Sequence, residues 1–130
     1  MQCPCCSFLP YDMCCRPLHD GTSVASSAHA LMRSRFSAFV LKKAQYIHDT
    51  YVPEERAEHP VGDIAQSLHQ RNWTRLEITN IVSIDSMNAR VTFLAFFQSG
   101  SQEFFFNEDS AFRKEEGIWL YWGKESTQLT

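Results

Sequence analysis

The sequence has no cysteine after residue 15, and it also lacks the features that mark several classes of protein. No apolar stretch approaches the length of about 20 residues that a membrane-spanning helix needs, so we expect no membrane span. The first residues do not show the basic segment, apolar run and small-residue cleavage site of a signal peptide. We therefore expect a soluble protein of the cytoplasm, where reducing conditions disfavour structural disulfides.

The sequence has no excess of positive charge. Lys and Arg number 12 against 15 Asp and Glu, which gives a formal net charge of −3. A general nucleic-acid binder depends on many cationic contacts with phosphates, so we do not expect that class of function. Residues 1–50 carry a small local surplus of basic side chains. A solvated helix face explains this surplus more simply than a binding patch does.

Catalytic signatures are also missing. The chain has no glycine-rich phosphate loop and no serine elbow, which are the motifs of two large groups of enzymes. No motif fixes a pair of titratable side chains for general acid–base catalysis. These absences favour a non-catalytic binding protein over an enzyme.

What the sequence does contain is a change of hydrophobic period between its two halves. The first half has apolar residues three and four apart, as in amphipathic helices, and the second half alternates apolar and polar residues, as in strands. We expect helices over residues 23–43, 44–51 and 61–70, a loop over residues 53–59, and strands over residues 76–85, 89–97, 103–112 and 118–122. Helices followed by a meander of strands predict an α+β domain whose helices cover one face of a curved antiparallel sheet.

The five cysteines crowd into the first segment, MQCPCCSFLPYDMCC, which has no periodic pattern of its own. Four thiolates, from Cys3 and Cys5 and, after eight residues, from Cys14 and Cys15, can satisfy a tetrahedral zinc ion. Metal binding supplies folding energy to a loop that lacks a hydrophobic core. The alternative is a set of free thiols that act in redox chemistry or in sensing soft metals.

Two groups of residues carry a resemblance to a known family. The segment CPCCSFLPYDMCCRPLHDG resembles the zinc-binding SEC-C motif of the bacterial preprotein translocase ATPase. ALMRSRFSAFV at residues 30–40, the Glu108-x-Ser110-x-Phe112 pattern and the GIWLY ending at residues 117–121 resemble the YchJ family. These bacterial proteins join an N-terminal SEC-C motif to a domain of nuclear transport factor 2-like fold.

The resemblance implies both an architecture and a set of site residues. It implies a zinc knuckle over residues 1–21 and a nuclear transport factor 2-like (cystatin-like) α+β domain of about four strands over residues 22–130. The family's zinc ligands fall on Cys3, Cys5, Cys14 and Cys15. It also implies that the knuckle can recognise a protein partner, which is not identified, and that two copies can form a homodimer through the open sheet face.

The chain departs from the SEC-C pattern at two positions. Cys6 and Phe8 stand where the motif usually has glycine, a residue that is placed where the backbone needs a positive φ or approaches a ligand closely. The knuckle can therefore differ in shape from the usual motif. Cys6 and His19 are further candidates for the metal site, and the sequence does not decide whether either joins it.

The wide end of such a sheet often holds a pocket, and several side chains are candidates for it. Arg33 and Arg35 lie two residues apart on a predicted helix and point about 200° apart, so one of them should enter the domain. A buried arginine needs a carboxylate or carbonyl partner, and Glu103 or Glu108 could provide it. The result is either a structural salt bridge or an anion-binding group in a pocket that His48 and Trp73 also line.

These observations lead to one preferred function and two alternatives. The preferred function is that of a zinc-binding, non-catalytic bacterial protein whose knuckle binds another protein. The first alternative is a small-ligand binder or an enzyme that uses the pocket. It ranks below the preferred function because it rests on fold analogy, which is weak evidence for function. The second is thiol redox chemistry or soft-metal sensing by the cysteine cluster.

Overall fold

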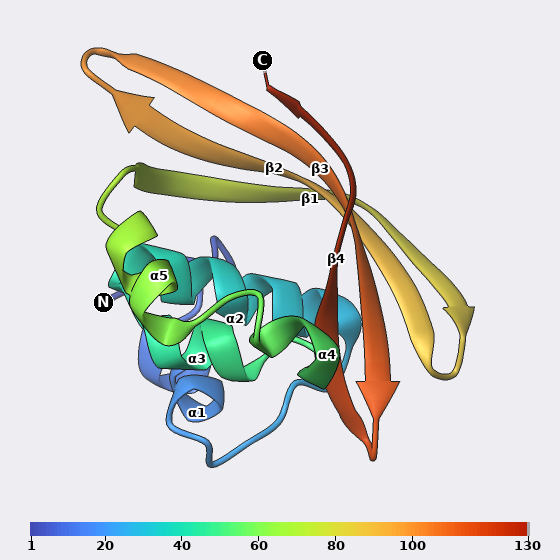
Figure 1. Cartoon of the computed structure of the whole chain (residues 1–130). Helices are drawn as coiled ribbons and strands as arrows, with labels where there is room; N and C mark the ends of the chain where they lie inside the picture. The colour runs from blue at the N-terminus through green and yellow to red at the C-terminus, as the bar shows by residue number, and fades with distance from the viewer. Residues whose placement is uncertain (130) are drawn as a thin grey trace.

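The protein is a layer of helices packed on one face of a curved sheet (Figure 1). The computed structural model describes residues 1–129, and for residues after 123 it describes the backbone alone. In chain order the elements are the 3-10 turn η1 (Tyr11–Met13), helices α1 (Arg16–His19), α2 (Ala28–Leu41), α3 (Ala44–Asp49), α4 (Pro53–Arg56) and α5 (Val61–Ser67), and strands β1 (Asn72–Asp85), β2 (Asn88–Ser99), β3 (Gln102–Glu115) and β4 (Ile118–Leu129). The predicted α+β class is therefore confirmed.

The sheet is antiparallel, with the strands in the order β1-β2-β3-β4. Tight hairpins connect each strand to the next, as the short turn segments predict. Register shifts in β1, between Trp73 and Arg75 and between Ile78 and Asn80, mark β-bulges. Because bulges bend a strand and increase its twist, they contribute to the curvature that leaves a concave face for the helices.

Helix α2 is the central helix of the fold. It begins where the Ser27 hydroxyl accepts a hydrogen bond from the Ala30 amide at 3.1 Å, and it ends at Lys42, whose φ of 59° is left-handed. One side packs on the sheet, where Leu31, Phe36 and their neighbours form the main core. Another side packs on α3 and α5 in a second, smaller cluster. With two sides covered, α2 also buries polar residues, among them Ser34, Arg35 and Ser37.

Two predictions need correction. The segment predicted as a loop over residues 53–59 begins with the short helix α4, because Pro53 at the first helical position has the fixed φ that a helix requires. Aromatic residues of the predicted strands are expected mainly in the core, but Trp122, in the last of these strands, is 41% exposed. The guanidinium carbon of Arg113 lies over its ring, 4.5 Å from the ring centroid.

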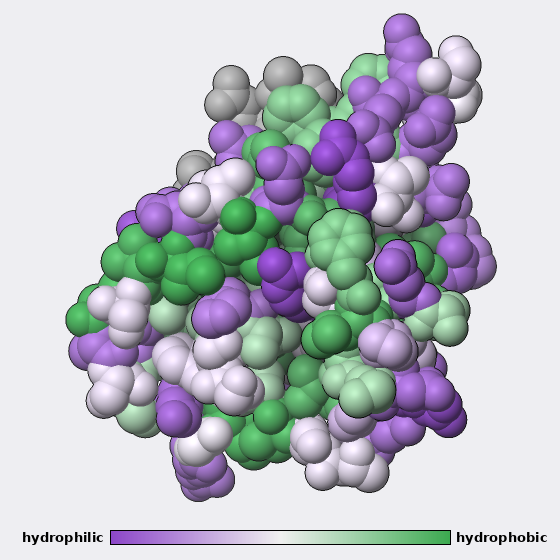
Figure 2. All heavy atoms as spheres, turned by 180° about the vertical axis from the view of Figure 1, so that it is seen from behind, coloured by the Kyte–Doolittle hydropathy of each residue, from purple (hydrophilic) through white to green (hydrophobic). Residues whose placement is uncertain are grey.

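Most of the other exposed large hydrophobic side chains lie in two places. They are Met1, Phe8, Leu9 and Met13 in the N-terminal segment and Ile81, Val82, Ile84 and Met87 around the β1–β2 hairpin. Seen from behind, hydrophobic side chains gather in several patches between hydrophilic ones (Figure 2). None of the helices in the described part of the chain is both long enough and apolar enough to cross a membrane.

Candidate metal centre and pocket

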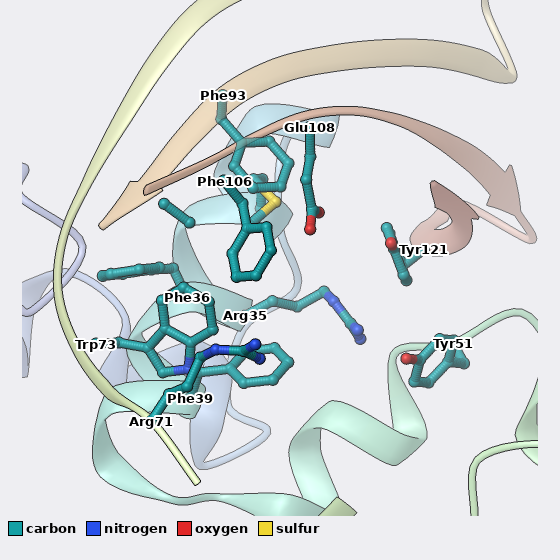
Figure 3. Close-up of a pocket in the computed structure, with 12 residues that line it drawn as sticks. Arg35, Phe36, Phe39, Tyr51, Arg71, Trp73, Phe93, Phe106, Glu108 and Tyr121 are labelled. Atoms are coloured by element: carbon teal, nitrogen blue, oxygen red, sulfur yellow. The ribbon is translucent and has the colours of Figure 1, made fainter. Parts of the chain in front are cut away.

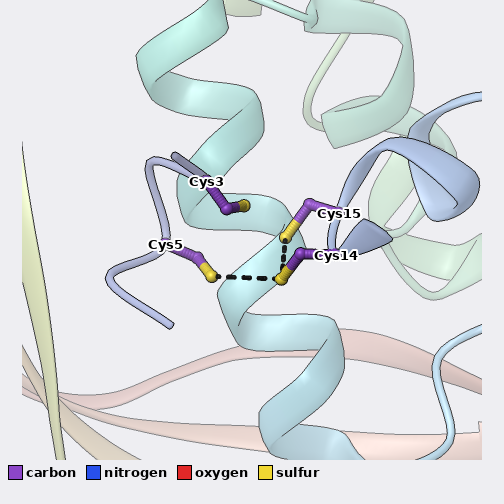
Figure 4. Close-up of side chains that lie close together, drawn as sticks. All are labelled: Cys3, Cys5, Cys14 and Cys15. Atoms are coloured by element: carbon purple, nitrogen blue, oxygen red, sulfur yellow. Dashed lines mark hydrogen bonds between the residues drawn. The ribbon is translucent and has the colours of Figure 1, made fainter. Parts of the chain in front are cut away.

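Four cysteine sulfurs meet beside α2 (Figure 4). Cys3 and Cys5 lie on a loop that is closed by the hydrogen bond from the Cys3 amide to the Leu9 carbonyl, at 2.8 Å. Cys14 and Cys15 lie between η1 and α1. The four sulfur atoms all lie within 4.8 Å of one another.

The spacing of the sulfurs fits a tetrahedral metal ion. Zinc–sulfur bonds of about 2.3 Å in a tetrahedron place the sulfurs about 3.8 Å apart. The Cys5 and Cys14 sulfurs are 3.7 Å apart, and the Cys14 and Cys15 sulfurs are 3.9 Å apart. Thiolate ligands select soft or borderline metals, so this cluster can hold such an ion.

The cluster also favours ionisation of one thiol. A hydrogen bond with the Cys15 thiol lowers the pKa of Cys5 to about 4. Burial acts in the opposite direction, and a hydrogen bond with Ser7 lowers the pKa further. The hydrogen bond between Cys5 and Cys15, together with burial, raises the pKa of Cys15, and burial raises the pKa of Cys14. The thiolate is the form that binds a metal, and Cys5 is the thiol whose lowered pKa most favours that form.

The other two candidates for this site lie outside the four-sulfur cluster. The Cys6 sulfur accepts a hydrogen bond from the Leu76 amide of β1 at 3.4 Å. The His19 Nε2 donates to the Ser34 carbonyl at 2.7 Å, and its Nδ1 accepts from the Tyr11 hydroxyl at 2.6 Å. Burial lowers the pKa of His19. Both residues therefore connect the knuckle, residues 1–21, to the rest of the domain.

The knuckle is also attached to α2 through the cysteines. The Ser37 hydroxyl donates to the Cys15 sulfur at 3.3 Å and lies 3.4 Å from the Cys3 sulfur. Arg33 donates from Nη1 to the Cys5 carbonyl at 2.8 Å. Polar groups next to ligands orient them and tune their affinity for metal. The polar residues on this side of α2 thus support the sulfur cluster.

The backbone has a positive φ at the two positions where the motif usually has glycine. Cys6 and Phe8 both have a φ of 68°, a left-handed conformation that costs a residue with a side chain about 1–2 kcal/mol. The sequence therefore keeps the backbone shape for which glycine is usually chosen, at the cost of local strain.

Replacing Phe8 with glycine is expected to raise the free energy of unfolding by about 0.5–1 kcal/mol, because the relief of strain exceeds the entropy that glycine adds to the unfolded chain. The Phe8 side chain is 78% exposed, so little burial is lost. Urea unfolding at fixed metal concentration measures the change. Leu9→Gly, at an exposed neighbour whose φ is not positive, serves as the control and should be destabilising. Equal effects of the two substitutions would contradict the strain at Phe8.

A cavity of about 230 Å³ lies between α2 and the concave face of the sheet (Figure 3). Its lining comprises Met32, Arg35, Phe36, Phe39, Tyr51, Arg71, Trp73, Phe93, Ala95, Phe106, Glu108 and Tyr121. The Arg35 side chain extends between Tyr51 and Tyr121 at one end of this cavity, and the aromatic side chains around Trp73 occupy the other end. The cavity therefore has a polar end and an aromatic end.

Arg35 is only 2% exposed. Its Nη1 donates to the Ile47 carbonyl at 2.8 Å and to the Thr50 hydroxyl at 2.6 Å. Its guanidinium carbon lies 4.6 Å from the ring centroid of Tyr51 and 4.3 Å from that of Tyr121. Burial lowers the pKa of Arg35 and raises that of Tyr121 to about 12.

Of the side chains expected at the pocket, Arg35, Trp73 and Glu108 line it. Arg33 points to the knuckle instead. His48 donates from Nδ1 to the His59 carbonyl at 2.8 Å, away from the cavity. The carboxylate expected as the arginine's partner is replaced by the Ile47 carbonyl and the Thr50 hydroxyl.

Glu103 also lies elsewhere, paired with Arg75 at 3.1 Å. It is five residues before Glu108 on the same strand, and alternate residues of a strand face opposite sides of the sheet. The two glutamates could therefore not both face the helices. Strand alternation would also have identified Tyr121 as a residue that faces the helices, because it lies two residues after the partly buried Trp119. Arg71 precedes β1, and no sequence signal marks it.

Comparison with known proteins shows similarity over nearly the whole chain. The family described as "YchJ, middle NTF2-like domain" matches residues 27–123. A UPF0225 protein of Corynebacterium glutamicum is 42% identical over 92% of this chain and 93% of its own length. A UPF0225 protein of Vibrio cholerae is 36% identical over 93% of this chain and 80% of its own length.

Two solved structures have the same fold. The solution structure of a SEC-C motif-containing protein from Rhodopseudomonas palustris aligns with a TM-score of 0.90 and 34% identity, over 98% of this chain and 100% of that one. The crystal structure of a SEC-C motif-containing protein from Psychrobacter arcticus aligns with a TM-score of 0.87 and 27% identity, over 100% of this chain and 84% of that one.

Proposed function

This chain belongs to the YchJ family, and on that premise we propose that it is a zinc-binding protein whose knuckle binds a protein partner. The sulfur spacing supports the metal, and the relatives with SEC-C motifs support the choice of zinc. Cys3, Cys5, Cys14 and Cys15 would hold the ion. A zinc ion with four cysteine ligands has no open position for a substrate, so its contribution would be structural.

The observation that carries the partner-binding proposal is the exposure of large hydrophobic side chains on the knuckle. Phe8 is 78% exposed and Met13 is 77% exposed. Both lie in the chain between the second and third cysteines of the cluster, which hold this loop in place. Groups of exposed large apolar side chains are typical of surfaces that bind other proteins.

Charge contributes less to this surface than the sequence suggests. Arg16 forms ion pairs with Asp12 and Asp20, Arg33 contacts the Cys5 carbonyl and Arg35 is buried. Three of the five basic side chains of residues 1–50 are therefore engaged by groups of the chain itself. The proposed surface recognises its partner mainly through apolar contact.

The test compares the wild type with the double variant Phe8→Ser, Met13→Ser, which changes the exposed surface and leaves the four cysteines in place. The immobilised proteins capture partners from a bacterial extract, and binding of the identified protein is then measured with purified components. We expect the double variant to bind at least about tenfold more weakly, as truncation of central apolar contacts does at other interfaces.

The matched control is Ile84→Ser with Met87→Ser, which removes exposed hydrophobic side chains at the β1–β2 hairpin, a different part of the molecule (Figure 1). The control should bind the partner as the wild type does. If the knuckle variant binds the purified partner as tightly as the control, the partner-binding proposal is wrong, whereas the metal proposal is unaffected.

A further inference from the structure

The cavity beside α2 contains a buried cation, Arg35, that none of the described side chains neutralises. Burial of a charge is costly unless it is paired. Among the side chains described, Arg16, Arg75, Arg90 and Arg113 form ion pairs with carboxylates at the surface. Within that same set no carboxylate forms an ion pair with Arg35, although it is the most deeply buried arginine.

The contacts of Arg35 leave part of its guanidinium available to a ligand. A guanidinium has five N–H donors. Nη1 of Arg35 donates to the Ile47 carbonyl and the Thr50 hydroxyl, and the Tyr51 side chain forms a further hydrogen bond with the group. The rings of Tyr51 and Tyr121 lie beside the charge and hold the planar group in one orientation. Figure 3 shows the guanidinium ending inside the cavity, between these two tyrosines.

The charges around the cavity favour one negative charge in the ligand. The lining includes two cations, Arg35 and Arg71, and one carboxylate, Glu108, so its formal charge is 2 − 1 = +1. Since Arg35 occupies the polar end, this is where an anionic group belongs. An arginine binds a planar carboxylate through two parallel hydrogen bonds.

The rest of the cavity is suited to a flat apolar body. Trp73 lies edge-on to Phe36 and Phe39, with ring centroids 6.3 Å apart in each pair. The exposed Arg71 lies over the ring of Phe106, with 4.7 Å between its guanidinium carbon and the ring centroid. A planar ring can stack among these side chains without placing polar atoms against them.

The size of the cavity limits the ligand. Its volume of about 230 Å³ corresponds to about eight water molecules at about 30 Å³ each, so it can hold a molecule of about eight to ten non-hydrogen atoms. This is smaller than the sites of about 300 Å³ or more that bind drug-sized ligands.

We infer that this cavity binds a small planar carboxylate, with its carboxylate on Arg35 between Tyr51 and Tyr121 and its ring against Trp73. This inference does not depend on the proposed role of the knuckle. It assigns to the α+β domain a ligand site that is separate from the metal centre and that faces the opposite side of α2 from Ser37.

The test uses benzoate as the probe, with benzamide and inorganic phosphate as comparisons, in isothermal titration of the wild-type, metal-loaded protein. We expect benzoate to bind with a dissociation constant of about 1 mM or below. Benzamide, which has the same shape without the charge, should bind at least about tenfold more weakly. Phosphate, which has charge without a ring, should also bind at least about tenfold more weakly.

Two variants locate the site. Arg35→Met should lose benzoate binding by at least about tenfold, and Arg75→Met, at an exposed arginine outside the cavity, should keep it. Arg35→Lys retains a cation without the planar fork and should bind more weakly than the wild type. If Arg35→Met does not fold, the three probes still test the inference on the wild type.

Several results would overturn the inference. Benzamide or phosphate binding as tightly as benzoate would show that the site does not select a planar carboxylate. Equal benzoate affinity in a folded Arg35→Met variant and in Arg75→Met would place binding elsewhere. Absence of saturable benzoate binding by the wild type would show that the cavity does not bind small planar carboxylates.

Discussion

Replacement of Cys5 with serine is expected to weaken zinc binding by more than about a hundredfold and to lower the melting temperature of the whole protein. Loss of a group that merely supports a ligand already costs about 10–100-fold in affinity, and Cys5 is itself one of the four ligands in the proposal. Structural zinc sites supply folding energy directly, about 10–16 kcal/mol in isolated zinc fingers.

The melting of the whole protein should change because the cluster is part of its interior. Cys5 is 0% exposed, and Cys3 and Cys15 are buried at 4% and 2% exposure. Ser37 of α2 contacts the sulfurs of both Cys3 and Cys15. Loss of the metal therefore uncovers one side of the central helix, so the sheet domain should become less stable together with the knuckle.

Cys6→Ser is the matched control for this prediction, because its sulfur faces β1 and lies outside the cluster. Native mass spectrometry counts bound zinc, and thermal melts with and without a chelator measure the coupled stability. The control should keep one zinc and the chelator-dependent shift in melting temperature. A Cys5→Ser protein that holds zinc as tightly as the control would contradict the assignment of the ligands.

Replacement of Phe112 with alanine is expected to lower the free energy of unfolding by about 3–5 kcal/mol, the usual cost of deleting a large buried aromatic side chain. Phe112 is 1% exposed and belongs to the core between α2 and the sheet. Its ring centroid lies 5.5 Å from that of Tyr121, which lines the ligand cavity. The substitution would leave a void in the centre of the domain.

The comparison is Phe104→Ala on the same strand, where the side chain is partly exposed and stacks on Phe97 with 5.7 Å between ring centroids. Removal of this ring should cost less than half as much as removal of the Phe112 ring. Urea unfolding at a constant zinc concentration measures the free energy of unfolding of both variants. Equal losses of stability at the two positions would show that the core does not centre on Phe112.

Sequence patterns predicted most of the fold because they report periodicity. The apolar spacing around Leu31 and Phe36 defines a helix with one buried side, and the alternation around Phe93 defines a strand, whatever lies opposite them. The four-residue helix α4 has no such pattern, because Glu54, Glu55 and Arg56 are all polar. Its place depends on Pro53 and on the ion pair between Glu54 and Arg113 of β3, a contact between distant parts of the chain.

The site could be predicted in its chemistry but only partly in its geometry. The requirement that a buried arginine finds an acceptor holds for Arg35, yet the acceptors are a carbonyl and a hydroxyl of α3 and its end, and no sequence pattern specifies backbone groups. The departure from glycine at Cys6 and Phe8 correctly marked two unusual positions, because positive φ is a local property of the chain.

Five successive residues of α2 face four different surroundings: the knuckle, α3, the cavity and the core. Arg33 reaches the Cys5 carbonyl, Ser34 accepts from the Tyr46 hydroxyl at 2.7 Å, Arg35 enters the cavity, Phe36 joins the core and Ser37 contacts the cysteines. One inserted residue rotates everything beyond it by about 100°. A change in length in this part of the chain should therefore be more damaging than any one substitution, since a single insertion would misalign the metal centre and the cavity together.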